Sequence, residues 1–440
     1  MSKKDTPFDR LLQLIAAKEA KIAVVGLGYV GLPLAKRIHD AGFSVTGFDI
    51  DKQKIVDLQG GITYLKHLGK TFVESLTRSK TFIPTYNPSD LANSDVIILC
   101  LPTPLDKNKN PDMQYVVSSA KMVSAILRNG QLVVLESTTW PGTTRELMVP
   151  LLEKSGLICG EDFFVGYSPE REDPGRTTPP QTDVPKVVSG LCDQSLELTT
   201  LFYSSVFSQT HKVSFVEVAE SSKLLENIYR AVNIALVNEM KVVLEKLDID
   251  IWEVVEASST KPYGFTPFYP GPGLGGHCIP IDPFYMSWKA RQVGRETRFI
   301  ELAGDINRNM PQIVVEKVLN LLSETKNPSV LVLGVAYKPN VDDIREAPSA
   351  EIISQLQQNR VSVSYHDPHC PTFPKMKRYD INLDSVPLTN ENLSGADLVL
   401  IVTHHDNIDW GFVGEHAKLI VDTRNVMNQY PQYRSKVIKA

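Results

Sequence analysis

The sequence is poor in cysteine, has no excess of positive charge and lacks any long apolar run. Its five cysteines are an odd number with no C-x-x-C pair, which argues against a disulfide framework or a structural zinc site and favours reduced thiols. A formal net charge of −5 provides no basic surface for nucleic acid or for an anionic membrane. We therefore expect a protein without a metal centre and without a nucleic-acid partner.

The lack of a long apolar run argues against a membrane-spanning helix. The apolar run near the N-terminus, LLQLIAA, has charged residues on both sides and is too short for a bilayer span or for the core of a signal peptide. Residues 1–20 are instead predicted to form a helical arm capped by Asp5 or Thr6. Without a signal peptide or a membrane span, the protein is expected to be cytoplasmic. Because 440 residues exceed the usual size of one domain, we expect two or three domains.

A glycine-rich segment near the N-terminus has the spacing of a dinucleotide-binding turn. A short apolar strand, KIAVVG, leads into GLGYVG, in which Gly26, Gly28 and Gly31 have G-x-G-x-x-G spacing. A helical pattern follows over residues 32–41, and the next strand, SVTGFDI, brings Asp49 to its end. Glycines let the backbone approach a pyrophosphate, and a carboxylate binds ribose hydroxyls but repels a 2′-phosphate. The segment predicts an NAD site; the alternative is a turn that only packs helix on strand.

Strands and helical patterns continue to alternate beyond this turn. DVIILCLPTP, QLVVLESTTWPGTT and FFVGYSPERED each read as a buried strand that runs into a polar or proline-rich turn. Loops at the carboxyl ends of parallel strands are where such sheets bind ligands. We therefore expect Thr103, Thr138 and Glu170 to face a common crevice, although each could equally be a turn former or a solvated surface group.

A long helical pattern follows over residues 216–247. It contains neither glycine nor proline, and its wide apolar stripe predicts burial between domains or against a second subunit. Lys223 and Asn227 lie four residues apart and so on one face. Surface solvation is the simpler explanation for both, but the helix leads through a further helical segment, 250–258, to the most unusual stretch of the chain.

That stretch, PFYPGPGLGGHCIPIDPFY at residues 267–285, combines glycine, proline and aromatic residues around one thiol. Its glycine and proline content predicts a loop rather than a long helix. Cys278 follows two glycines and His277, and Asp282 comes four residues later. Because glycine-rich backbone lets a ligand come close, we interpret the stretch as an active-site loop with Cys278 as its nucleophile. Helices are predicted over 284–308 and 311–323.

The last third of the chain resembles the first. The strand SVLVLG, a helix over 349–358 and the strand VSVSYHDP, which ends at Asp367, repeat the opening order. The glycine pattern is missing after Gly334, and Lys338 and Arg345 occupy the turn, which suits a phosphorylated ligand unless the loop is simply solvated. The predicted fold is therefore α/β, with two doubly wound Rossmann-like domains joined by a long central helix.

Several segments together resemble the UDP-glucose/GDP-mannose dehydrogenase family from about residue 20 onward. They are GLGYVGLPLA, LCLPTPL, ESTTWPGTT, YSPERE, KLLENIYRAVNIALVNE, GPGLGGHCIPIDP and GVAYKPNVDDIRE. The branch of UDP-N-acetyl-D-glucosamine 6-dehydrogenases is similar at SPEREDPG, at TKPYGFTPFYPGPGLGGHCIPIDPFY and at THHDNIDW. The UDP-glucose branch usually has a SPEF-type sequence where this chain has SPER, so the resemblance disfavours glucose.

The resemblance implies oxidation of a sugar C6 alcohol to a carboxylate with two NAD⁺, through a thiohemiacetal and a thioester on Cys278. It implies an NAD-binding domain over 21–212, a central helical domain over 213–325 that forms a homodimer core, and a UDP-sugar-binding domain over 326–440. Larger assemblies are possible. A role in surface polysaccharide biosynthesis, such as O-antigen or capsule, follows from the branch.

The resemblance also implies residue roles. Lys223 and Asn227 would stabilise the oxyanion, Thr138 and Asp282 would hold the hydrolytic water, and Glu170 would act in acid/base chemistry, with the division between Glu170 and Asp282 open. The remaining implied residues bind ligands. For the cofactor these are Gly26, Gly28, Tyr29, Val30, Gly31, Asp49, Thr103, Thr138 and Arg345, and for the substrate Glu170, Arg171, Lys223, Asn227, Phe265, Phe268, Tyr269, Gly275 and Lys338. His277 would be a loop residue rather than a base.

Three alternatives stay open. The same chemistry could act on UDP-N-acetylgalactosamine, UDP-N-acetylmannosamine or UDP-glucose, because the motifs do not read sugar stereochemistry. A nucleotide-binding regulatory protein would not need Cys278, Lys223, Asn227 and Asp282 together. An alcohol dehydrogenase that stops at the aldehyde would not need the thiol.

Overall fold

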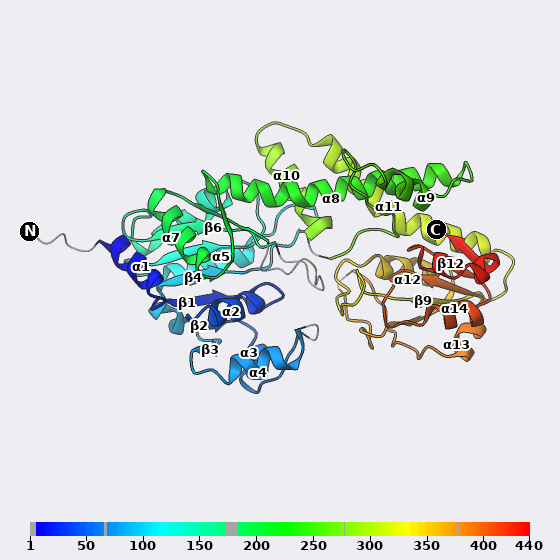
Figure 1. The fold of residues 1–440 in the computed structure, drawn as a ribbon, viewed down its shortest axis with the longest axis horizontal. Helices are drawn as coiled ribbons and strands as arrows, with labels where there is room; N and C mark the ends of the chain where they lie inside the picture. Colours follow the sequence, from blue (N-terminus) through cyan, green and yellow to red (C-terminus); the bar gives the residue numbers. More distant parts are fainter. Residues whose placement is uncertain (1–5, 66–67, 172–183, 277, 377) are drawn as a thin grey trace, which may run out of the picture. The chain divides into compact units, whose positions relative to one another are not determined.

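The computed structural model describes residues 6–65, 68–171, 184–276, 278–376 and 378–440 (Figure 1). They form two compact units. The first unit is Met1–Glu226 with Trp288–Arg295, and the second is Asn227–Ser287 with Glu296–Ala440. Two helices, α8 (Val216–Glu245) and α10 (Cys278–Gln292), contribute residues to both units.

The first unit is built on an eight-stranded sheet with the order β3-β2-β1-β4-β5-β6-β7-β8. All neighbouring strands are parallel except β6 and β7. The strands are β1 (Lys21–Val25), β2 (Ser44–Phe48), β3 (Phe82–Thr85), β4 (Val96–Leu99), β5 (Leu132–Leu135), β6 (Phe164–Tyr167), β7 (Lys186–Gly190) and β8 (Thr210–Lys212). The helices are α1 (Pro7–Ala16), α2 (Gly31–Asp40), α3 (Lys52–Gln59), α4 (Lys70–Thr77), α5 (Gln114–Ser124), α6 (Val149–Leu152) and α7 (Asp193–Ser204).

The second unit contains a five-stranded parallel sheet with the order β10-β9-β11-β12-β13. Its strands are β9 (Ser329–Leu333), β10 (Ser362–His366), β11 (Leu398–Ile401), β12 (Ile420–Asp422) and β13 (Val437–Lys439). Its helices are α9 (Ile251–Ser259), α11 (Arg298–Leu321), α12 (Pro348–Gln358), α13 (Asn390–Gly395) and α14 (Trp410–His416). In both sheets the order reverses beside the first strand, which confirms the predicted doubly wound α/β fold.

Both faces of each sheet are covered. Ile22 and Val24 of β1 belong to one buried cluster of apolar side chains. Ala23 and Val25 belong to another, because successive side chains of a strand point to opposite faces. Strand β9 divides its residues between two clusters in the same alternating way. This is the arrangement expected for parallel sheets, whose strands read as continuous apolar runs because neither face meets water.

The helical arm predicted at the N-terminus packs into the first unit. Thr6 caps α1 by accepting from the Asp9 amide, and Asp9 accepts from the Thr6 amide in return. Leu11 and Ile15 are buried in the same cluster as the sheet residues. Asp5, the alternative cap, lies outside the described residues. Among the described residues, no helix is long and apolar enough to cross a membrane.

The expected loop around the thiol is partly a helix, so the prediction for 267–285 is wrong from Cys278 onward. Helix α10 begins at Cys278 and continues to Gln292 through Pro280 and Pro283. Pro280 is tolerated because amides in the first turn of a helix have no intrahelical partner, so that a missing N–H is no loss there. Pro283 lies inside α10, where it removes one intrahelical N–H, and the helix continues past it to Gln292.

The boundary between the two helices predicted after this stretch is also wrong. Residues 284–308 do not form one helix, because α10 ends at Gln292 and Gly294 follows with φ +71°, a left-handed conformation that suits glycine at a helix end. Helix α11 then runs from Arg298 through Pro311 to Leu321 without the break predicted before Pro311.

Candidate active site

The turn after β1 has room only for glycine at two of its three glycine positions. A Cβ on Gly26, whose φ is +91°, would lie 2.2 Å from the carbonyl oxygen of Cys100 after β4. A Cβ on Gly31 would lie 1.8 Å from the carbonyl oxygen of Gly26. These glycines therefore let β1, β4 and the start of α2 approach closely. Gly28 differs, because a Cβ there would meet nothing within 4 Å.

This turn fits a dinucleotide. Helix α2 starts without a side-chain cap, and a Cβ on Gly28, three residues before it, would meet no atom within 4 Å, so a pyrophosphate could approach the start of the helix. Asp49 follows β2 and is buried, and its carboxylate accepts from the Leu27 amide at 3.0 Å. Tyr29 and Val30 are half-buried in the same turn.

Three predicted site residues follow neighbouring strands at one edge of the first sheet. Thr103, Thr138 and Glu170 come after β4, β5 and β6, which are adjacent in the sheet. Thr103 is buried, and Thr138 and Glu170 are half-buried. Lys223 of α8 is also buried, and its charge contributes to lowering the pKa of Glu170. In the first unit, the structure thus gathers these residues at the ligand-binding edge expected for such sheets.

Glu170 belongs to a buried charge cluster that sequence reasoning missed. The Lys186 Nζ donates to Glu136 Oε2 at 2.9 Å and to Glu170 Oε2 at 2.8 Å, and the Tyr203 hydroxyl donates to Glu136. The side chains of Glu136 and Lys186 are 0% and 3% exposed. A signal was present in the sequence, because Glu136 stands in the ESTTWPGTT segment and Lys186 opens an apolar strand.

The cluster separates the two carboxyl groups electrostatically. Burial raises the pKa of Glu136 to about 7 against the opposing effect of Lys186. Burial acts on Glu170 in the same sense, but the charge and hydrogen bond of Lys186 outweigh it and lower the pKa of Glu170 to about 2. Burial disfavours the ammonium form of Lys186, but the charges of Glu136 and Glu170 outweigh it and raise its pKa.

Arg171, predicted to bind substrate, is engaged within the protein. Its guanidinium donates to the Pro185 carbonyl at 2.9 Å and forms an ion pair with Glu226 at 2.7 Å. Its own amide donates to Glu170 at 2.7 Å. The residue therefore braces the segment that carries Glu170.

The second unit brings two predicted catalytic residues into direct contact. The Asn227 amide group on α8 donates to Asp282 Oδ2 on α10 at 2.5 Å, and both side chains are about 1% exposed. Cys278 is half-buried at the first residue of α10 and lies one turn before Asp282. The amide end of a helix favours an anionic group, which suits a thiolate. His277 lies outside the described residues.

The glycine segment before Cys278 packs against the loop that carries Lys338 and Arg345. A Cβ on Gly275 would lie 2.5 Å from the Tyr337 side chain, and the Gly276 amide donates to the Arg345 carbonyl at 2.9 Å. Arg345 also holds Asp343 through a bidentate ion pair. Two segments separated by about sixty residues of sequence therefore meet within the second unit, as expected where glycine lets backbones approach.

The start of the same segment is fixed by residues that sequence reasoning missed. The Gly271 amide donates to Asn238 Oδ1 at 3.0 Å, and Asn238 in turn donates to Asn307 at 3.0 Å, which links α8 to α11. Arg424, at the carboxyl end of β12, lies so close to Gly271 that a Cβ there would be 2.6 Å from its Nη1.

The aromatic residues predicted to cover the substrate lie on the same segment. Phe268 packs edge-on against Tyr229 at 5.7 Å, and Tyr269 stacks on Trp252 at 5.3 Å. Phe265 and Tyr269 are 39% and 46% exposed, so both have surface for a ligand.

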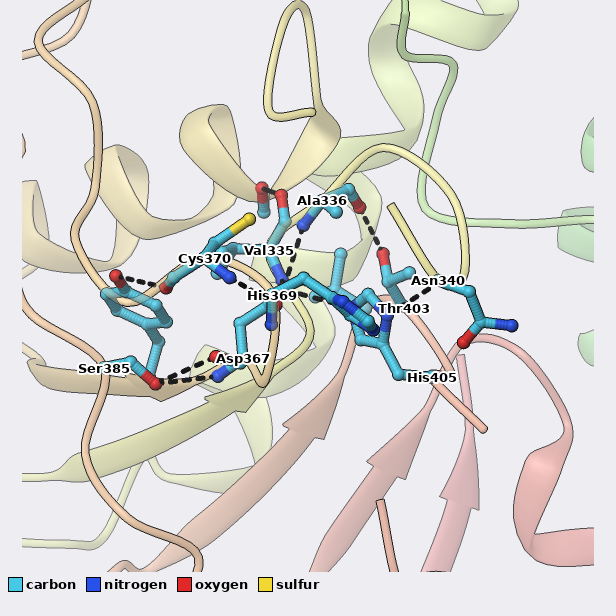
Figure 2. A network of polar contacts seen from close by, with 12 residues as sticks. Val335, Ala336, Asn340, Asp367, His369, Cys370, Ser385, Thr403 and His405 are labelled. Atoms are coloured by element: carbon cyan, nitrogen blue, oxygen red, sulfur yellow. Dashed lines mark hydrogen bonds and ion pairs between the residues drawn. The ribbon is translucent and has the colours of Figure 1, made fainter. Parts of the chain in front are cut away.

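The loop after β9 is fixed by a buried carboxylate (Figure 2). Asp367 accepts from the amides of Val335 and Ala336 at 2.7 and 3.2 Å and from His405 Nε2 at 3.1 Å. His405 Nδ1 accepts from the Asn340 amide at 3.0 Å, which ties the loop to the same imidazole. Lys338, a predicted substrate-binding residue, thus lies between residues whose backbone amides are hydrogen-bonded.

Sequence models of the UDP-glucose/GDP-mannose dehydrogenase family match the chain in three consecutive segments. The NAD binding domain of that family matches residues 20–208, the central domain residues 217–309 and the UDP binding domain residues 331–429. Together they cover most of the chain.

Individual proteins match over nearly the whole length. Protein CapL of Staphylococcus aureus is 37% identical over 418 residues, which are 92% of this chain and 96% of CapL. The UDP-N-acetyl-D-glucosamine 6-dehydrogenase of Pseudomonas aeruginosa is 36% identical and covers 88% of this chain and 91% of its own. Among solved structures, a UDP-D-ManNAc dehydrogenase of Pyrococcus horikoshii matches with a TM-score of 0.81 at 31% identity, over 92% of this chain and 95% of that one.

The different surroundings of the turn glycines predict different defects. Gly31→Ala places a methyl group against the Gly26 carbonyl and should destabilise the first unit by about 2 kcal/mol. Gly28→Ala meets no protein atom and should fold like the wild type, yet bind NADH at least about tenfold more weakly, because the methyl group occupies the space of the pyrophosphate. Thermal unfolding and NADH fluorescence titration measure the two effects; wild-type affinity in Gly28→Ala would remove the pyrophosphate from this position.

The Asp367 carboxylate should make stability depend on pH. Burial alone would raise its pKa, but the His405 contact and the backbone amides lower it to about 2. The native state therefore gains stability above the ordinary pKa near 3.8 and loses it as the pH falls from about 4 to 2. Asp367→Asn should lower the free energy of unfolding by about 2 kcal/mol at pH 7, with the difference shrinking below pH 4. Denaturant titrations beside the exposed control Asp380→Asn measure this, and a pH-independent difference would contradict it.

Proposed function

The chain belongs to the UDP-glucose/GDP-mannose dehydrogenase family and is an NAD-dependent nucleotide-sugar dehydrogenase, and we propose that it oxidises C6 of UDP-N-acetyl-D-glucosamine to the carboxylate. The observation that carries the two-step chemistry is the thiol of Cys278 at the start of α10, one turn from the bonded pair Asn227 and Asp282. A dehydrogenase that stopped at the aldehyde would have no use for this arrangement.

The turn after β1 would hold the cofactor. Gly28, Val30 and Gly31 would receive the pyrophosphate at the start of α2, and Asp49 would accept from the adenosine ribose. Tyr29 and Thr103 would line the same crevice, with Thr138 near the reacting end. Bound NAD⁺ supplies the hydride acceptor for each of two oxidations.

Cys278 would divide the oxidation of the aldehyde into easier steps. Its Sγ adds to the aldehyde carbon to form a thiohemiacetal, loss of hydride from that carbon gives a thioester, and water breaks the C–S bond to release the carboxylate. One alcohol, one water and two NAD⁺ thus give one carboxylate, two NADH and three protons. Lys223 and Asn227 would stabilise the oxyanions, and Thr138 and Asp282 would hold the water.

The substrate would lie against the second sheet's loops. Lys338 and Arg345 carry cations suited to the diphosphate of the substrate, and Arg345 would also contact a phosphate of the cofactor. Phe265, Phe268 and Tyr269 would cover the nucleotide sugar, and Gly275 would let it approach. Glu170 and Arg171 are further candidates for contact with the sugar.

The identity of the sugar rests on the branch. The segment SPER and the long match around Cys278 favour N-acetylglucosamine, in line with the 36% identity to the Pseudomonas aeruginosa 6-dehydrogenase. UDP-N-acetyl-D-mannosamine is the second candidate, since a UDP-D-ManNAc dehydrogenase matches the fold with a TM-score of 0.81. The product would be a UDP-N-acetylhexosaminuronic acid for surface polysaccharide, made in the cytoplasm.

Helix α8 would form the core of a homodimer. Tyr229, Leu236, Met240 and Val243 are 40–54% exposed, and at 100° per residue they share one face within about 60°. An exposed apolar stripe of this kind marks an interaction surface.

NADH yield tests the reaction. With excess NAD⁺, each UDP-N-acetyl-D-glucosamine consumed should produce two NADH, and UDP-N-acetyl-D-mannosamine, UDP-N-acetylgalactosamine and UDP-glucose should react more slowly. In the Cys278→Ser control, uronate release should fall at least about a hundredfold, because an alkoxide is a poor leaving group. A yield of one NADH, or full activity in Cys278→Ser, contradicts the thioester route. Preference for another sugar would retain the chemistry and overturn the substrate.

The proposed dimer is tested on α8. Leu236→Glu places a charge on the apolar stripe and should shift the protein toward monomers in light scattering coupled to size exclusion. Arg230→Glu introduces the same residue about 100° away from the stripe and should leave the dimer intact. A monomeric wild type, or an unaffected Leu236→Glu dimer, would rule this interface out.

A further inference from the structure

The Glu136–Lys186–Glu170 cluster exists because three neighbouring strands end or begin at one sheet edge. Glu136 and Glu170 follow the carboxyl ends of the parallel strands β5 and β6. Strand β7 is antiparallel to β6, so its first residue, Lys186, lies at that same edge. The antiparallel strand is therefore what delivers a cation between two carboxylates.

The contacts within the cluster are unequal. Lys186 Nζ bridges the two carboxyl groups at 2.9 and 2.8 Å, and Glu136 receives the Tyr203 hydroxyl. Glu136 is fully buried, whereas the Glu170 side chain is 13% exposed. The Lys186 cation thus bridges two carboxyl groups, and Glu136, the more deeply buried of the two, is the one that burial drives toward the neutral form.

We propose that Lys186 and Glu136 are positioning residues for the reaction, which hold Glu170 as a permanent carboxylate, with Lys186 as its counter-ion and the more deeply buried Glu136 as the member of the pair that takes up a proton. Glu170 then acts as a hydrogen-bond acceptor for the substrate or for water and not as a general acid or base. The proton from the hydrolytic water must go elsewhere, which leaves Asp282 as the base. This role rests on the proposed function, because it takes Glu170 as a member of the reacting set.

Three further groups near the cluster lie among the described residues. Lys223 adds a second positive charge that favours the Glu170 carboxylate. Arg171, the next residue, is directed to Glu226. Tyr203 faces Glu136, and burial together with that carboxylate raises the pKa of Tyr203, so it stays a donor.

The pH dependence of kcat/KM for the sugar, between about pH 5 and pH 9, tests the proposal. In Lys186→Met the carboxyl pair Glu136 and Glu170 has lost its cation, so the pair binds a proton more strongly. An acid limb should then appear, with activity at pH 5.5 at least about tenfold below that at pH 8.5. Lys186→Arg retains the cation and should retain the wild-type profile. A loss that is equal at every pH in Lys186→Met would show a merely structural role and overturn the proposal.

Glu136→Gln is the matched control. The amide is neutral as the protonated acid is, its oxygen can accept from Lys186, and it carries no titratable proton. The pH profile of kcat/KM should therefore keep the shape that it has in the wild type. A loss comparable to that of Lys186→Met, or a shifted acid limb, would mean that Glu136 must ionise, which contradicts the proposal.

Glu170→Gln separates this proposal from the function on which it rests, and it does not depend on the folding of the Lys186 variants. Glu170→Gln should lower kcat/KM at least about tenfold with an unchanged pH profile, because an amide accepts one hydrogen bond where a carboxylate accepts several. If the wild type shows an acid limb that Glu170→Gln abolishes, Glu170 titrates. The positioning proposal then fails, and the proposed dehydrogenase function stands. If it has no effect at any pH, Glu170 has no part in the reaction, and its proposed role in the function fails as well.

Discussion

Both units depend on the same interaction. In each, a carboxylate at the end of the second strand accepts a hydrogen bond from a backbone amide in the turn after the first strand. Asp49 accepts from the Leu27 amide in the first unit, and Asp367 accepts from the Val335 amide in the second. In each case a glycine with positive φ precedes the amide, and a Cβ on it would collide with a carbonyl oxygen after the neighbouring strand. The same local solution thus opens the ligand edge of both sheets.

The two units then use this shared turn in different ways. After Gly26 the chain enters α2 within five residues, so the start of that helix faces a space that no side chain fills at Gly28. After Gly334 no helix starts until Pro348, and the carboxylate of Asp367 is instead surrounded by backbone amides and His405. A carboxylate so fully occupied has no capacity for a ribose. The first turn is suited to a dinucleotide, and the second to a loop that presents cations.

The two proposed site carboxylates, Glu170 and Asp282, have different hydrogen-bond partners. In the first unit, Lys186 between Glu136 and Glu170 keeps one buried carboxyl group ionised beside a neutral one. In the second unit, the buried Asp282 carboxylate accepts from the amide group of Asn227. One carboxyl group is thus fixed by a cation on a strand of its sheet, and the other contacts a neighbouring helix.

Local patterns in the sequence determined the doubly wound α/β fold, the glycine turn and the long helix, because apolar periodicity and glycine spacing act within a few residues. The sequence singled out Cys278 as a candidate nucleophile, but the prolines around it predicted a loop. Only the structure shows that Cys278 begins a helix, which tolerates Pro280 because an amide in the first turn has no intrahelical partner. The contacts of Lys186 with Glu136 and Glu170, and of Asn238 with Gly271, were decided by the tertiary structure alone. They join residues 16 to 50 positions apart, and only the order and direction of the strands and helices bring such residues together.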